Sequence, residues 1–196
     1  MSDPETIATY DARATAYAEH FSNTAPDADL QAFIDALPDG GHVLDLGCGP
    51  AHSAAMMQRA GLRVTAWDAS AEMVALARRL HGIEAEQRTF DALECQQTFD
   101  GVWANFSLLH APRQDFRRHL KAIHAALKNG GLLHLGLKTG TGTKRDTLGR
   151  LYTFFTPTEL TDHLHSTGFT PIASRQGREV GLAGTEDPFI ILRATR

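Results

Sequence analysis

The fold is decided by the stretch Val43-Leu44-Asp45-Leu46-Gly47-Cys48-Gly49-Pro50-Ala51-His52-Ser53. It starts inside a short apolar run, residues 42–46, which is typical of a buried strand, and it turns at a cluster of glycines. The residues that follow, 53–60, are compatible with a helix. Glycine allows a sharp turn and a close approach to a ligand, and the first turn of a helix offers free N–H groups. The stretch therefore predicts a strand, a ligand-binding turn and a helix in succession.

The same alternation continues toward the C-terminus. The expected strands cover residues 62–67, 83–90, 99–105, 132–137, 169–175 and 188–194, and the expected helices cover residues 70–81, 113–127 and 157–167. The last two strands are joined without a helix, so they should be antiparallel. Strands that alternate with helices predict a parallel sheet with right-handed crossovers. We therefore expect an α/β fold, a Rossmann-like, doubly wound and mostly parallel seven-stranded sheet with an antiparallel final strand and helices on both faces.

Two helices are expected before the deciding stretch, over residues 4–21 and 27–37. In the first of them, apolar residues that include Tyr10, Tyr17 and Phe21 recur at intervals of three and four. This spacing predicts one apolar stripe, whose aromatic members also carry a polar group. The helix should therefore lie on another part of the protein.

The length of 196 residues predicts one compact domain. Within it, we expect residues 1–38 to form an N-terminal helical lid and residues 39–196 to form a Rossmann-like domain. The 19 basic and 23 acidic residues give no positive field of the kind that attracts nucleic acid. No window has the roughly 18 apolar residues of a membrane span, and acids stand where a secretory signal would have bases, so a cytoplasmic location without a membrane partner is expected.

The cysteines and histidines predict neither a disulfide nor a metal site. Cys48 and Cys95 are far apart and neither belongs to a CxxC motif. His163 and His165 are two residues apart on an expected helix, which points them in different directions. The simplest interpretation of Cys48 is a small side chain packed in the glycine turn.

Three carboxylates stand at the ends of three successive strands of the expected sheet. Asp45 stands two residues before Gly47, where it would repel a phosphate and attract an ammonium group. Asp68 ends the next strand, where an acid can accept hydrogen bonds from two ribose hydroxyls. Asp91 follows the third, where it could accept from the exocyclic amine of a base. Together they describe a ligand with an amine, a ribose and an adenine but no phosphate.

The runs VLDLGCGPAHS, VTAWDASAEM and FDGVWANFSLLHAP closely resemble the class I S-adenosylmethionine-dependent methyltransferases. The resemblance implies that Asp45, Gly47 and Gly49 line the methionine end of S-adenosylmethionine and that Asp68 holds its ribose. It also implies that Met73 lies near the adenine, whose amine is taken by Asp91 with Ala92. The full expected cofactor-binding set is Tyr17, Asp45, Gly47, Cys48, Gly49, Asp68, Ala69, Met73, Phe90, Asp91, Ala92 and Asn105.

The resemblance covers about residues 40–194, and it departs from the family pattern at one position of the glycine turn. Ala51 stands where the class often has a third glycine. Within the class, the runs KTGTGTKRDTLGRLYTFFTPTEL and GLAGTEDPF are similar to a group of small bacterial methyltransferases described as tellurite-resistance-like. Residues 105–108 lack the Asn-Pro-Pro-aromatic sequence of methyltransferases that act on planar amino nitrogens, which weakens a base or glutamine as the acceptor.

The acceptor is expected near the residues that follow the later strands. His110 is the best-placed imidazole for a general base, and the alternative is a structural hydrogen bond at its turn. The segment 138–155 has no clear period, and its basic residues predict a lid over an anionic or polarisable small molecule, unless it is an ordinary solvated loop. The full expected acceptor-binding set is Tyr10, His110, Lys138, Arg145, Arg150, Tyr152 and Phe155.

The sequence thus predicts an enzyme that transfers a methyl group from S-adenosylmethionine to a small-molecule acceptor by in-line displacement. The alternative is a non-catalytic S-adenosylmethionine-binding sensor or partner protein, because the sequence contains no indispensable base. A nicotinamide oxidoreductase is disfavoured, since His52 replaces the third glycine of the dinucleotide fingerprint and Asp45 would repel pyrophosphate. The acceptor and the oligomeric state are left open.

Overall fold

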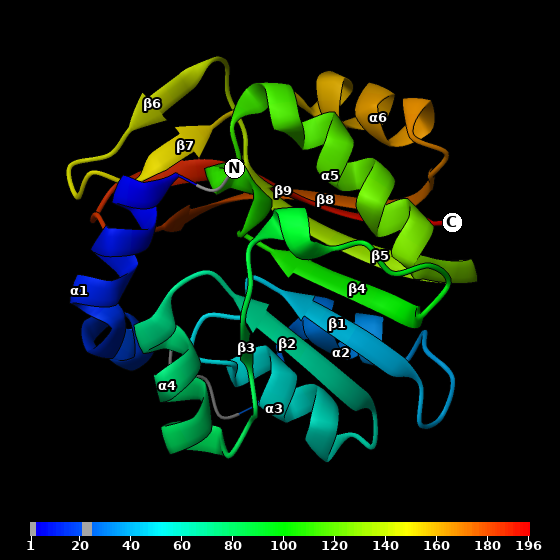
Figure 1. The fold of residues 1–196 in the computed structure, drawn as a ribbon. Coiled ribbons are helices and arrows are strands. Elements are labelled where there is room, and N and C mark those ends of the chain that lie inside the picture. The colour runs from blue at the N-terminus through cyan, green and yellow to red at the C-terminus, as the bar shows by residue number, and fades with distance from the viewer. Residues whose placement is uncertain (1–2, 21–24) are drawn as a thin grey trace.

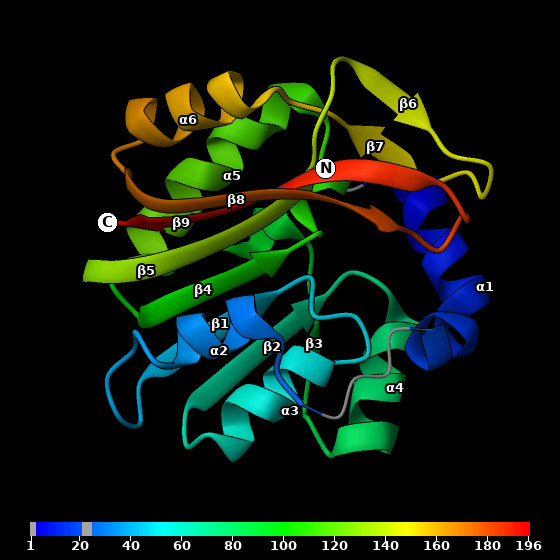
Figure 2. The same ribbon diagram turned by 180° about the vertical axis from the view of Figure 1, so that it is seen from behind.

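The computed structural model describes residues 3–20 and 25–196 and is built around one seven-stranded sheet (Figures 1 and 2). The strands lie in the order β3-β2-β1-β4-β5-β9-β8. Their bounds are β1 His42–Leu46, β2 Arg63–Asp68, β3 Glu86–Gln87, β4 Phe99–Asn105, β5 Leu127–Lys138, β8 Thr170–Val180 and β9 Glu186–Thr195. Neighbours from β3 to β5 are parallel, and β9 runs antiparallel to both β5 and β8. The predicted fold class is therefore confirmed.

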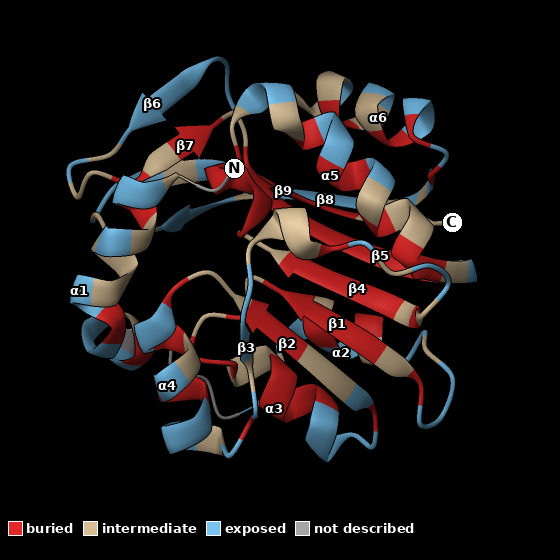
Figure 3. Cartoon of the chain, viewed as in Figure 1, coloured by how far each residue is buried: buried red, intermediate tan, exposed pale blue. Residues whose placement is uncertain are grey.

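Helices cover both faces of this sheet. Their bounds are α1 Pro4–His20, α2 Ala28–Ile34, α3 His52–Arg59, α4 Ala71–His81, α5 Arg113–Ala126 and α6 Pro157–Ser166, with short 3-10 helices η1 Phe90–Ala92 and η2 Leu108–His110. On one face, Phe116 of α5 and Leu160 of α6 join the buried side chains of β4, β5 and β9. On the other face, Phe33 of α2 and Met57 of α3 meet Trp103 of β4. Figure 3 shows the central strands as the most continuously buried part of the protein.

Side-chain caps fix the starts of two helices where the sequence predicts them. Ser70 accepts a hydrogen bond from the backbone N–H of Met73 at 3.1 Å and so begins α4. Thr156 and Glu159 form the reciprocal capping box of α6. Each cap satisfies N–H groups that have no partner inside the helix, which explains why these boundaries are readable from sequence.

The segment from residue 138 to residue 155 is not the structureless loop expected from its composition. Thr143–Arg145 (β6) and Leu151–Thr153 (β7) form an antiparallel hairpin, with Lys144 opposite Tyr152. The hairpin is fastened to α1, because the backbone N–H of Leu151 donates to Thr6 Oγ1 at 2.8 Å. The segment is therefore an ordered wall.

Several other predicted boundaries are wrong; β8, for example, ends at Val180 instead of residue 175. Strand β3 has two residues instead of the expected eight, and its side chains are exposed. Strand β5 begins directly after α5, so that Lys128–Gly131 belongs to the strand and not to a turn. Lys128 Nζ lies 2.8 Å from Asp100, and the pairing of β5 with β4 is irregular between Phe99 and Gly101.

Helix α1 lies beside the edge at which β1, β2 and β4 end (Figure 1). Its Ala14 and Ala18 pack on Met73 and Leu76 of α4, so one face of the helix is buried. Phe21, which the sequence placed in the apolar stripe, lies outside the described residues. No helix in the described part of the chain is long and apolar enough to cross a membrane.

Candidate active site

Two adjoining pockets lie at the carboxyl ends of β1, β2 and β4. The small pocket has a volume of about 80 Å³ and is lined by residues that include Asp68, Ala69, Met73 and Phe90. The large pocket has a volume of about 270 Å³ and is lined by residues that include Asp45, Cys48, Lys138, Arg150 and Tyr152. The residues that line both are Tyr10, Tyr17, Gly47, Gly49, Asn105, Phe106 and His110. This is the edge at which an open α/β sheet usually binds its ligand.

The glycine turn after β1 forms the floor that the two pockets share. Gly47 and Gly49 have φ of 80° and 54°, which is the left-handed region that glycine adopts without strain. A Cβ atom at Gly47 would lie 2.3 Å from Cβ of Ser107, so a larger residue does not fit. Ala51 is also left-handed, with φ of 65°, at the position where the family often has glycine. The turn thus lets the backbone approach the pockets closely.

Asp45 presents a carboxylate oxygen that the protein leaves without a partner. Its Oδ2 atom is buried and accepts no hydrogen bond from any described residue. Burial, reinforced by the nearby charge of Asp68, raises the pKa of Asp45 to about 8, although the backbone N–H of Ala54 opposes the rise. A buried, unpaired carboxylate is costly and is usually compensated by a cation. Asp45 therefore suits a ligand with an ammonium group.

Asp68 fixes the glycine turn and still keeps acceptor capacity. Its two oxygens accept hydrogen bonds from the backbone N–H of Gly49 at 2.8 Å and of Ser70 at 2.9 Å. Burial raises the pKa of Asp68, and the two N–H donors partly offset the rise. Each carboxylate oxygen can accept a second hydrogen bond. The geometry fits a pair of ligand hydroxyls.

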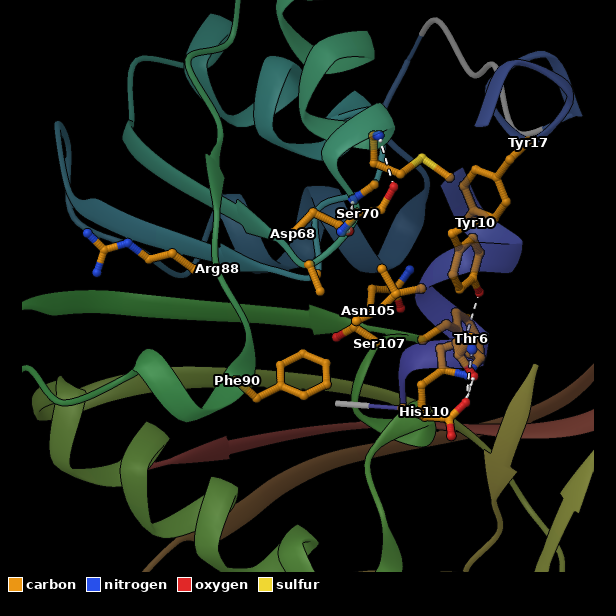
Figure 4. A pocket seen from close by; sticks show the side chains of 17 residues that line it. Thr6, Tyr10, Tyr17, Asp68, Ser70, Arg88, Phe90, Asn105, Ser107 and His110 are labelled. Carbon is orange, nitrogen blue, oxygen red and sulfur yellow. Dashed lines mark hydrogen bonds between the residues drawn. The ribbon is translucent and has the colours of Figure 1, made fainter. Parts of the chain in front are cut away.

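Apolar side chains form the rest of the small pocket (Figure 4). Met73 is almost fully buried, and Phe90 stands across the pocket from α4 in the close view. Asp91 and Ala92, which were expected beside an adenine amine, line neither pocket. The Asp91 carboxylate lies 2.5 Å from the Arg118 guanidinium of α5, which lowers its pKa even though burial opposes the shift. The structure therefore gives Asp91 a different contact from the expected one.

Tyr10, His110 and Arg150 form a hydrogen-bonded chain in the wall of the large pocket. Tyr10 Oη lies 2.7 Å from His110 Nε2 and 3.2 Å from Arg150 Nη1. The first of these contacts is drawn as a dashed line in Figure 4. His110 Nδ1 lies 2.6 Å from the carbonyl oxygen of Leu151. Burial lowers the pKa of His110 to about 4, so the imidazole is neutral at pH 7. The structure thus shows the structural hydrogen bond that was one expected alternative for His110, and the role of a general base stays a prediction.

The basic side chains expected to attract an anion are paired with carboxylates. Lys138 Nζ lies 2.6 Å from Asp187, and Arg150 Nη2 lies 2.7 Å from Asp146. Arg145 lines neither pocket, because its guanidinium reaches out to Asp3 at 2.8 Å and holds α1 to the hairpin. Asp187 and Asp3 from outside the segment thus pair with Lys138 and Arg145, and Asp146 from inside it pairs with Arg150.

The two aromatic residues expected as an apolar wall have different places. Tyr152 lines the large pocket, with its ring 4.8 Å from the ring of His110. Phe155 is fully buried away from the pockets. The centre of its ring lies 4.4 Å from the ring centre of Phe116 and 5.4 Å from that of His163. Phe155 thus belongs to the core between α5 and α6.

Two further residues that the sequence did not single out for a site also line the pockets. Ser70, the cap of α4, also lines the small pocket. Phe106 lines both pockets and has a left-handed backbone, with φ of 52°, which no local pattern signals. Among the described residues, no group of three or more acids, histidines and cysteines is placed to hold a metal ion.

Part of the chain is similar to known methyltransferases. Residues 43–131 match the family model described as a methyltransferase domain. The chain is 36% identical over 143 residues to cypemycin N-terminal methyltransferase of a Streptomyces species, a match that covers 69% of this chain and 57% of that protein. It is 38% identical over 104 residues to a ubiquinone biosynthesis O-methyltransferase of Xanthomonas oryzae pv. oryzae (strain PXO99A), covering 49% of this chain and 42% of that protein. The chain thus spans about half the length of these curated relatives.

Solved structures show the same fold. The 1,6-didemethyltoxoflavin-N1-methyltransferase of Burkholderia thailandensis, solved with 1,6-didemethyltoxoflavin and S-adenosylhomocysteine, has a TM-score of 0.72 at 24% identity, covering 100% of this chain and 91% of that chain. A methyltransferase of Methanosarcina mazei has a TM-score of 0.75 at 19% identity, covering 88% of this chain and 98% of that chain.

Proposed function

We propose that the chain is a class I S-adenosylmethionine-dependent methyltransferase that transfers a methyl group from S-adenosylmethionine to a small-molecule acceptor by in-line displacement; the methyltransferase-domain match over residues 43–131 and the similar curated methyltransferases support this. The observation that carries the proposal is the buried Oδ2 atom of Asp45, which has no partner among the described residues. The cofactor has an amino-acid arm with an ammonium group, and that group would supply the missing partner. Of the two curated relatives described above, one is named as an O-methyltransferase of ubiquinone biosynthesis and the other as an N-terminal methyltransferase of cypemycin.

The residues around the two pockets fit S-adenosylmethionine. Asp45 would hold its ammonium group, Asp68 its ribose hydroxyls, and Met73 and Phe90 the faces of its adenine. The bound cofactor supplies a methyl group that is already activated by a sulfonium centre. The remaining expected contacts are Tyr17, Gly47, Cys48, Gly49, Ala69 and Asn105, which line the pockets, and Asp91 and Ala92, which do not.

The protein's task is then to bring the acceptor in line with the methyl group. Holding two reactants at near-attack distance can lower a barrier by roughly 7 to 11 kcal/mol. Tyr10, His110 and Tyr152 would surround the acceptor in the large pocket. A polarisable acceptor suits these aromatic rings, whereas the ion pairs of Lys138 and Arg150 remove the main support for an anionic one.

We also propose that residues 1–38 form the N-terminal helical lid that the sequence predicts. Tyr10 and Tyr17 of α1 line both pockets, which supports a covering role for this helix. Helix α2 is instead built into the sheet core, with the ring of Phe33 5.1 Å from Trp103. Membership in the tellurite-resistance-like group and a cytoplasmic location also stay predictions from the sequence.

The test is binding followed by turnover. We expect calorimetry to show binding of S-adenosylhomocysteine, and we expect a screen of small acceptors to yield S-adenosylhomocysteine above background. Binding of NAD without binding of S-adenosylhomocysteine would contradict the proposal. Binding of S-adenosylhomocysteine without turnover of any acceptor would favour a non-catalytic binding protein instead.

A further inference from the structure

The hydrogen bonds that link Arg150, Tyr10, His110 and Leu151 in the wall of the large pocket can be donated in only one direction. A carbonyl oxygen only accepts, so His110 Nδ1 must carry the proton that is shared with Leu151. Because the imidazole is neutral, His110 Nε2 is then an acceptor, and Tyr10 Oη–H donates to it. Arg150 only donates, so its Nη1–H donates to the oxygen of Tyr10. The donor and the acceptor of each of these three hydrogen bonds are therefore assigned.

This arrangement leaves Tyr10 ready to accept one more hydrogen bond. A phenolic oxygen has two lone pairs, of which Arg150 uses one. His110 does not have the same freedom, because both of its ring nitrogens are engaged. Of these two groups in the pocket wall, only Tyr10 can therefore receive a proton from a ligand without breaking a contact.

The surroundings of Tyr10 limit the kind of ligand that can supply that proton. The cations that line the large pocket, Lys138 and Arg150, are each paired with a carboxylate. Rings of Tyr17, Phe106 and Tyr152 also line it. Such a pocket favours a flat, uncharged molecule over a free anion.

We propose that Tyr10 is the catalytic residue that takes the proton of the acceptor and relays it to His110, and that the acceptor is an uncharged molecule with a hydroxyl group on an aromatic ring. This inference rests on the proposed methyl transfer and deepens it. Asp146 holds Arg150 against Tyr10 through two hydrogen bonds, at 2.9 and 2.7 Å, so the guanidinium stabilises negative charge on the phenolic oxygen as the proton passes.

The step is balanced in atoms and charge. The acceptor oxygen forms a bond to the methyl carbon as the bond from that carbon to the cofactor sulfur breaks, with the electron pair left on sulfur. The acceptor proton moves to Tyr10 Oη while the proton of Tyr10 moves to His110 Nε2. The imidazolium that results keeps its Nδ1–H on the Leu151 carbonyl. Proton loss to solvent then restores the starting state.

The resting protonation states agree with this relay. Burial raises the pKa of Tyr10 to about 12, although Arg150 opposes the rise, so Tyr10 is a phenol at pH 7. Burial lowers the pKa of His110 to about 4, and Arg150 and Lys138 act in the same direction while Asp146 opposes them. A phenol beside a neutral imidazole is the pair that can pass a proton inward.

The experiment uses ring hydroxyls of graded acidity as acceptors: phenol, 4-nitrophenol and pentafluorophenol. S-adenosylhomocysteine formation is measured for the full chain and for Tyr10→Phe and His110→Gln, at a pH where phenol is protonated and pentafluorophenol is ionised. We expect both variants to lose about 10²- to 10⁴-fold in kcat with phenol, which is the usual contribution of general-base catalysis. The loss should shrink toward none with pentafluorophenol, because that acceptor has no proton to give.

A matched control is Tyr17→Phe, which removes a hydroxyl from the same helix and the same pockets. Any loss in this variant should be the same for all three acceptors. A loss in Tyr10→Phe and His110→Gln that does not depend on acidity would overturn the relay. If the chain binds S-adenosylhomocysteine but methylates none of these hydroxyls, the assigned acceptor class is overturned while cofactor binding stands. Failure to bind S-adenosylhomocysteine would instead overturn the proposed function.

Discussion

Asp45 couples cofactor binding to a proton, because its carboxyl group has a pKa of about 8 in the ligand-free protein. At pH 7 the group is mostly protonated, whereas an ammonium ligand requires the carboxylate. Binding of S-adenosylhomocysteine should therefore release a proton, and the affinity should rise by up to about tenfold per pH unit until about pH 8. Calorimetry in buffers of different ionisation enthalpy measures the release, which Asp45→Asn should abolish.

The same shift makes the fold depend on pH. The folded protein keeps the Asp45 proton up to about pH 8, whereas the unfolded chain loses it near the ordinary value of 3.8. The folded state thus binds more protons in this window, so the contribution of Asp45 to the free energy of unfolding falls as pH rises from about 4 to 8. Urea denaturation of Asp45→Asn should show a shallower decline over this window, and an identical decline in both proteins would contradict the assignment.

The sequence predicts that Asp68 and Asp91 both bind the cofactor, so the effects of replacing each acid on S-adenosylhomocysteine affinity can be compared. Asp68→Ala should weaken S-adenosylhomocysteine binding by about ten- to 150-fold, which corresponds to the roughly 1.5 to 3 kcal/mol of charge-assisted hydrogen bonds. Asp91→Ala is the matched control and should weaken it much less, because the Asp91 carboxylate contacts Arg118 and not the small pocket. Equal losses in calorimetry would mean that Asp91 turns toward the ligand on binding.

The positions of some site residues could be predicted from the sequence, and those of others could not. Asp45 and Asp68 lie at the carboxyl ends of neighbouring parallel strands, so their common location could be predicted. Arg145 and Phe155 could not be placed, because their partners, Asp3 and Phe116, are distant in the sequence. A charge or a ring in an unassigned segment does not specify what it will contact.

Helix α1 is held in place from two sides. Arg145 of β6 contacts Asp3, and Ser70 at the start of α4 donates to Asp11 at 2.5 Å. Arg145→Ala should loosen the first turns of α1, which would appear as faster amide hydrogen exchange there and faster release of S-adenosylhomocysteine. The exposed neighbour Lys144 provides the control, since Lys144→Ala should leave the exchange of α1 unchanged.

The elements that were predicted well carry their own local signals. Strands β1 and β4 have the predicted bounds, and α4 and α6 begin at readable caps. The strand predicted over residues 83–90 is too long. Its sequence is polar and does not mark where pairing stops, and only two of its residues pair with β2. Hairpin β6–β7 was missed because strands of three residues are too short to show a period. Their pairing depends on contacts across the hairpin.

At the scale of the whole molecule, a ligand that binds only the folded chain must stabilise it. S-adenosylhomocysteine at 100 times its dissociation constant should add about 2.7 kcal/mol to the free energy of unfolding. For a chain of this size, that gain corresponds to a rise in Tm of roughly 5 to 11 °C. A thermal scan checks this, with NAD at the same concentration as the control. A larger shift with NAD would favour a nicotinamide site.

The pocket wall brings together segments that are far apart along the chain. Thr6 meets Leu151 and Tyr10 meets His110, so α1 completes its contacts with the pocket wall only after residues 145 and 100 positions apart have come together. Closing loops of this length costs entropy that local contacts do not repay, which places this docking late in folding. A chain with a complete sheet but an undocked first helix would show native-like secondary structure and still fail to retain a nucleoside. Ligand retention is therefore a stricter criterion of native assembly for this protein than its circular dichroism spectrum.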